Sequence, residues 1–149
     1  MYFEQGIEQG FQWCGVYTAA NGTMSDGSGL SPYTNNADCK WLIAPSDATH
    51  ITITFTEFAT EVNYDLVTVW QCSSITCANS QIIAVLSGTY ATSQTFTSTT
   101  GFVRLDFISD GSNNDAGFTA NWTASLRTPA PVSMYVHALV VPLLNMLIR

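Results

Sequence analysis

The chain has 149 residues, which is enough for one domain with a sizeable core, and 46% of them are hydrophobic. Charged residues make up only 10%, and four Lys or Arg against eleven Asp or Glu give a formal net charge of −7. A nucleic-acid partner is therefore not expected, because a nucleic-acid-binding protein needs basic groups to displace phosphate counterions. An acidic surface favours cations instead, either metal ions or the basic groups of a partner.

In chain order, a Gly-, Ser- and Asn-rich segment over 21–36 is expected to form a poorly packed loop. After it, short runs rich in β-branched and aromatic residues alternate between apolar and polar side chains. Residues 50–58, for example, place Ile51, Ile53 and Phe55 opposite three threonines. Strands are predicted at 39–44, 50–58, 64–71, 81–86, 92–97 (an edge strand), 101–108 and 116–126. Many short strands at regular spacing predict an all-β, antiparallel two-sheet sandwich.

The two ends of the chain differ in composition from this region. Residues 1–13 are expected to be an N-terminal lead-in, without the basic start and apolar run of a signal peptide, so a longer parent protein is expected. The domain itself is placed at 14–127. Residues 128–149 are interpreted as a Pro-containing linker and an apolar tail interrupted by His137, Pro142 and Asn145. The tail is too short and interrupted to span a bilayer alone, but it is compatible with a truncated membrane helix, a cleaved anchor signal, another domain or a fragment end.

Four cysteines fall into two close pairs, Cys14 with Cys39 and Cys72 with Cys77. An even number in a small chain predicts two disulfides paired in this way, and a zinc site is the weaker alternative. Two Asn-x-Thr sequons, at Asn21 and Asn121, also favour an extracellular location, secreted or at the cell surface, and are predicted glycosylation sites.

An ordered series of short motifs runs through most of the chain. It consists of Cys14, Gly29-Leu30-Ser31-Pro32, residues 33–43, Pro45, the strand around Phe55, Glu61, Tyr64-Asp65-Leu66-Val67-Thr68-Val69, Leu86-Ser87-Gly88, residues 107–113 and Gly117-Phe118-Thr119-Ala120. In this order and spacing, residues 14–125 resemble a CUB domain of the calcium-binding type. The resemblance implies a jelly-roll sandwich of the extracellular space. One departure is clear: between Glu61 and Tyr64 there is no cysteine, where the family usually has one.

The resemblance also implies a calcium site. The three acidic ligands of the family fall on Glu61, Asp65 and Asp110, supplemented by the Ser112 carbonyl and the Asn113 side chain. Tyr33 matches a tyrosine that hydrogen-bonds to the acidic cluster. Hard oxygen ligands in this number suit Ca²⁺ and argue against zinc or copper. From the residues alone, 110–115 could equally be a plain turn, and Asp65 could cap backbone amides at a strand start.

Three functions are compatible with these patterns. The first, which the resemblance implies, is an extracellular, calcium-dependent protein-binding or adhesion module that captures an exposed Lys or Arg of a partner beside the ion. The second is carbohydrate binding through exposed Tyr90, Trp70 or Trp122, although core packing explains these rings better. The third is catalysis by Glu61 and Asp65, but metal ligation explains the pair better and no nucleophile motif is present, so no enzyme activity is expected.

Overall fold

The computed structural model describes residues 13–131, and in this part of the chain every regular element is a β-strand. The strands are β1 (Trp13–Tyr17), β2 (Asn21–Ser25), β3 (Asp38–Ile43), β4 (Ala48–Ala59), β5 (Leu66–Cys72), β6 (Ser80–Leu86), β7 (Gln94–Thr97), β8 (Phe102–Ile108) and β9 (Gly117–Leu126). Within residues 13–131 there is no helix of the length and apolarity that a membrane crossing requires.

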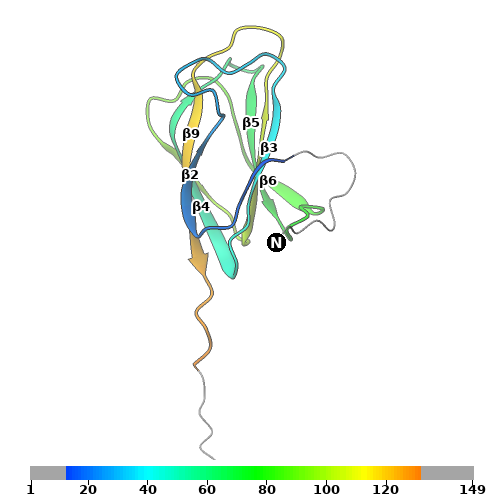
Figure 1. Cartoon of the computed structure of the whole chain (residues 1–149), viewed down its shortest axis with the longest axis vertical. Coiled ribbons are helices and arrows are strands. Elements are labelled where there is room, and N and C mark those ends of the chain that lie inside the picture. Colours follow the sequence, from blue (N-terminus) through cyan, green and yellow to red (C-terminus); the bar gives the residue numbers. More distant parts are fainter. Residues whose placement is uncertain (1–12, 132–149) are drawn as a thin grey trace, which may run out of the picture.

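The strands form two sheets that face each other (Figure 1). The five-stranded sheet has the order β1-β3-β8-β5-β6, and the four-stranded sheet has the order β2-β9-β4-β7. All neighbouring pairs are antiparallel except β1 and β3, which run parallel. The two-sheet β-sandwich predicted from the sequence is therefore confirmed, and β7 is an edge strand as expected.

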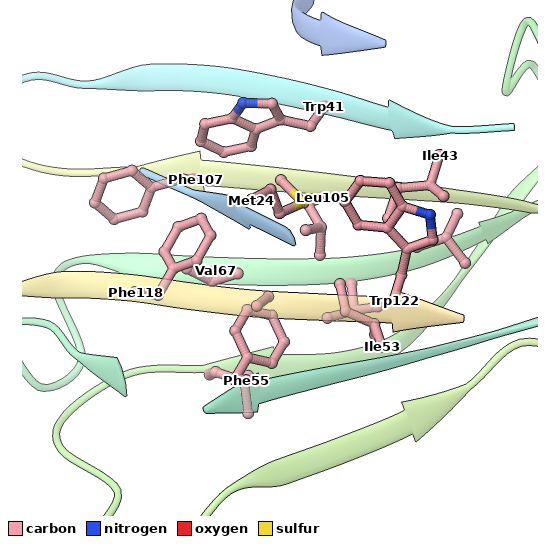
Figure 2. Close-up of a cluster of buried hydrophobic side chains, with 14 of the residues drawn as sticks. Met24, Trp41, Ile43, Ile53, Phe55, Val67, Leu105, Phe107, Phe118 and Trp122 are labelled. Carbon is pink, nitrogen blue, oxygen red and sulfur yellow. The ribbon is translucent and has the colours of Figure 1, made fainter. Parts of the chain in front are cut away.

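The core lies between the sheets and is filled by alternate residues of the strands, because successive side chains of a strand point to opposite faces. Phe55 of β4 and Phe107 of β8 are almost completely buried, and both contact the ring of Phe118 on β9. Figure 2 shows these rings with the aliphatic side chains between the two layers. Such aromatic groups bury large apolar areas, so they supply much of the energy that holds the sheets together.

The segment 21–36 is better ordered than its composition suggests. Residues 21–25 form β2, which pairs with β9, and Met24 is 4% exposed in the core. Tyr33, in the following loop, is equally buried. The prediction of a poorly packed loop was wrong for residues 21–25 and for Tyr33, because β-pairing and two buried side chains anchor them, whereas the rest of 26–36 is a mostly exposed loop.

Both predicted cysteine pairs are disulfides in the structure. Cys14–Cys39 connects β1 to β3, and Cys72–Cys77 closes the loop after β5. Cys72 and Cys77 also belong to a small second hydrophobic cluster with Leu42 and Ala44. The first strand begins at Trp13, one residue before the expected domain start. Of the predicted lead-in and tail, residues 1–12 and 132–149 lie outside the described residues.

Candidate metal centre

Three predicted ligands come together at one end of the sandwich, the upper end in Figure 1. Glu61 follows the end of β4, Asp65 directly precedes β5, and Asp110 follows β8. Since β4 and β8 end where β5 begins, segments far apart in the sequence meet there. One carboxylate oxygen from each residue lies within 4.8 Å of those from the other two.

Asp65 is the buried centre of this group, with none of its surface exposed. Its Oδ2 accepts a hydrogen bond of 2.5 Å from the Tyr33 hydroxyl, and its Oδ1 accepts one of 2.8 Å from the Asp110 amide. Its backbone carbonyl accepts from Thr60 Oγ1 at 2.9 Å. A buried carboxylate needs such partners, and these contacts fix its orientation against two of the loops.

Tyr33 connects the cluster to the core. Its hydroxyl donates to Asp65 and accepts from the Glu61 amide at 3.0 Å, and its ring meets Phe107 edge to face at 5.1 Å between centroids. Burial, together with the hydrogen bond to Asp65, raises the pKa of the Tyr33 hydroxyl from 10.0 to about 12. The hydroxyl therefore stays protonated at neutral pH and remains a donor to the carboxylate.

The two outer carboxylates are held less completely. Glu61 Oε1 accepts from Asn113 Nδ2 at 2.9 Å, whereas Glu61 Oε2 is buried without a hydrogen-bond partner. Asp110 Oδ1 accepts from the Ser112 amide at 2.9 Å. Asn113 has a positive φ of 58°, a conformation that asparagine tolerates better than most residues and that turns the loop back toward Glu61. The contacts of the described residues do not include the Ser112 carbonyl, so its role stays a prediction.

The donor set fits a hard cation. Ca²⁺ binds oxygen at 2.3–2.6 Å, so two ligands on opposite sides of the ion are separated by about 4.6–5.2 Å. The three carboxylate oxygens all lie within 4.8 Å of one another, so no two of them are farther apart than two ligands of one ion can be. Glu61 Oε2, buried and lacking a donor, is the kind of atom that a cation satisfies. The ion pairs Lys40–Asp38 and Arg104–Asp106 lie on the five-stranded sheet and do not involve the cluster.

Two supporting residues were not identified from the sequence. The Asn36 amide donates to the Asp110 carbonyl at 2.6 Å, and Thr60 connects the Asp65 carbonyl to the Gly88 amide through its hydroxyl. Asn36 has a positive φ of 55°, and Thr60 is 2% exposed. The sequence could not indicate either role. Asn36 acts through its backbone amide, and Thr60 differs from many surface threonines only in being buried.

The three aromatic residues considered for carbohydrate stacking are engaged in packing. Trp122 is 4% exposed and lies in the core, so it offers no sugar-binding surface. The Arg104 guanidinium covers the Trp70 ring at 4.7 Å from its centroid, and Tyr90 contacts Phe58 at 5.3 Å between centroids.

These features define a class of protein: a disulfide-linked two-sheet sandwich whose loops gather carboxylates at one end. A match to the CUB domain model extends over residues 14–122, and the chain belongs to the CUB domain family. CUB domains are protein-interaction modules of extracellular proteins and are typically non-catalytic. The two disulfides fit that location.

Individual relatives agree with this assignment. The chain is 33% identical over 117 residues to the zinc metalloproteinase nas-39 of Caenorhabditis elegans, a match that covers 74% of the chain and only 11% of that protein. The full extracellular region of zebrafish Gpr126/Adgrg6 matches with a TM-score of 0.65 and 25% identity, over 78% of the chain and 15% of that structure. The MASP-1 CUB2 domain, in a structure bound to Ca²⁺, matches over 76% of the chain and its own full length, with a TM-score of 0.63 and 18% identity.

Proposed function

We propose that this domain is a calcium-dependent protein-binding module of an extracellular protein. Glu61, Asp65, Asp110 and Asn113, with the Ser112 carbonyl, would hold the ion. A bound Ca²⁺ supplies positive charge that holds the three carboxylates together and fixes the loops that carry them. The observation that carries the proposal is Glu61 Oε2, a buried carboxylate oxygen without a donor beside two other carboxylates.

The calcium-bound MASP-1 domain supports the proposal, because a similar fold holds the same ion. Because the two sequences are only 18% identical, this likeness supports the fold alone. The choice of ligands rests on the residues of this chain.

The partner is expected to present a Lys or Arg side chain. Glu61 and Asp110 are partly exposed, so they can face a basic group while Asp65 stays buried. Exposed apolar side chains lie close to them in the sequence: Val62 is 59% exposed, Tyr64 is 64% exposed, and Ile108 is 52% exposed. A charged anchor beside exposed apolar area is a suitable surface for a protein partner.

Thermal unfolding with calcium and with a chelator tests the metal part of the proposal. For a dissociation constant of ~0.1 mM, millimolar calcium stabilises the fold by about 1–2 kcal/mol. For a domain of this size that is a rise in Tm of roughly 3–6 °C. Asp110→Ala should reduce or abolish the rise. Asp115→Ala, in the same loop but outside the cluster, is the matched control and should keep it. Identical melts of the unmodified chain in both conditions would exclude the calcium site.

A further inference from the structure

The two Asn-x-Thr sequons, 100 positions apart in the chain, lie side by side on neighbouring strands. β2 and β9 are antiparallel, and their register places Asn21 opposite Thr123 and Thr23 opposite Asn121. Each asparagine thus faces the threonine of the other sequon. In such a pair the two asparagines are diagonal neighbours, with Cα atoms roughly 7–8 Å apart.

The pairing also fixes which side chains reach solvent. Asn21, Thr23, Asn121 and Thr123 are all exposed, whereas the middle residues of the two sequons, Gly22 and Trp122, are partly or fully buried. Gly22 is opposite Trp122, whose indole ring occupies the space that a Cβ on residue 22 would need. The Trp122 ring is held by Tyr17, at 4.8 Å between centroids, and by a 3.0 Å hydrogen bond from Nε1 to the Ala19 carbonyl.

One hydrogen bond connects the sequons on the outer face. Thr23 Oγ1 donates to Asn121 Oδ1 at 2.8 Å. This contact uses the amide oxygen of Asn121 and not Nδ2, the nitrogen to which an N-linked glycan is joined. A glycosylated asparagine keeps its carbonyl oxygen, so the bond between the strands is compatible with modification.

We propose that Asn21 and Asn121 both carry N-linked glycans, which stand next to each other on the outer face of the four-stranded sheet. The donor is an oligosaccharide joined to a lipid pyrophosphate. A bond forms between Nδ2 and the sugar C1 carbon, the bond from C1 to the pyrophosphate oxygen breaks, the pyrophosphate leaves with the electron pair, and Nδ2 loses a proton. Extracellular proteins pass through the compartment where this donor is used.

The rest of this face is compatible with glycan cover. Next to the sequons it carries small hydroxyl side chains that pair across β4 and β7, Thr52 with Thr97 and Thr54 with Thr95, each at 3.0 Å between Oγ1 atoms. Asn121 is the fifth residue of β9, roughly 13 Å along the strand from the acidic end of the sandwich. The glycans therefore leave the carboxylate cluster accessible, and their presence does not depend on calcium binding.

The test is to direct the full chain through the secretory pathway of cultured eukaryotic cells and to measure intact masses before and after enzymatic release of N-glycans. Two glycans are expected on the unmodified chain, and Asn21→Gln and Asn121→Gln should each remove one. Thr123→Val should remove the glycan of Asn121 while that asparagine remains, and Thr123→Ser should keep it. These two variants decide the question at Asn121 even if Asn121→Gln fails to fold. A secreted chain with no glycan, or with only one of the two asparagines modified, would overturn the proposal that both are glycosylated.

Discussion

The Tyr33 hydroxyl donates a 2.5 Å hydrogen bond to Asp65 Oδ2 and so connects the loop before β3 to the first turn before β5. Both residues are buried, and the same hydroxyl accepts from the Glu61 amide. One oxygen atom thus holds two of the three acidic segments in place. The Tyr33 hydroxyl therefore helps to position the Glu61 and Asp65 carboxylates relative to each other.

Tyr33→Phe should destabilise the metal-free domain and weaken calcium binding. The substitution keeps the ring against Phe107 but leaves Asp65 Oδ2 and the Glu61 amide without their partner. Loss of one partner of a buried polar group costs about 1–3 kcal/mol. Urea unfolding in chelator measures this loss, and a calcium titration by calorimetry measures the change in affinity.

Tyr64→Phe is the control for that experiment, because Tyr64 is near the same cluster but is 64% exposed. Its stability should stay within about 0.5 kcal/mol of the unmodified chain. Equal stabilities of the Tyr33 and Tyr64 variants would show that the buried hydroxyl does not organise the site.

The two disulfides should contribute unequally to stability. Cys14 and Cys39 are 25 residues apart, and Cys72 and Cys77 are 5 apart. In the chain-entropy model these loops correspond to roughly 3.5 and 2 kcal/mol. Replacing the first pair by serines should therefore lower the free energy of unfolding more than replacing the second, as measured by denaturant titration. A larger loss from the second pair would indicate that its packing against Leu42 and Ala44 outweighs loop closure.

Gly22→Ala should destabilise the domain although it retains the Asn21 sequon. The added methyl group overlaps the indole ring of Trp122, which is buried and held in place by a hydrogen bond. Overpacking of this kind costs about 1–3 kcal/mol. Ser25→Ala, at an exposed position of the same strand, is the control and should change stability by less than about 0.5 kcal/mol. Thermal melts of the two variants would show equal Tm values if the Trp122 ring could move aside without cost.

The sequence predicted the strands with clear alternation, such as β4 and β8, because a half-buried strand must place apolar residues on every second position. It did not predict β1 and β2. In β2 only Met24 is a buried apolar side chain, and Gly22 is needed by the neighbouring Trp122 rather than by β-propensity. The parallel pairing of β1 with β3 depends on contacts across a long sequence separation, which local patterns do not contain.

The candidate site likewise contains residues that could be predicted from the sequence and residues that could not. Glu61, Asp65 and Asp110 were identified by resemblance to a family, and the fold brings them together. The supporting contacts of Asn36 and Thr60 could not be predicted, since a backbone amide and a buried hydroxyl acquire their roles only from the tertiary arrangement of the loops.

The last prediction concerns the partner. If the carboxylates of the calcium-loaded cluster accept a basic group, immobilised peptides that carry one Lys or Arg beside apolar residues should retain the domain in calcium. Peptides with Gln in place of the basic residue should not retain it. Retention should fall in chelator and decrease with rising salt, because exposed ion pairs are screened.

Asp110→Ala should abolish this retention together with the calcium-dependent rise in Tm, since Asp110 would serve both as a ligand of the ion and as an acceptor for the basic group. It should leave the core intact, because Asp110 follows β8 in a loop outside the hydrophobic cluster. Asp115→Ala should behave like the unmodified chain in both assays. A variant of Asp110 that loses the calcium response but still binds Lys peptides would separate the two roles and leave the metal a purely structural one. Unfolding of the variant at room temperature in calcium would instead assign the Asp110 carboxylate to the structure of the loop, through its contact with the amide of Ser112.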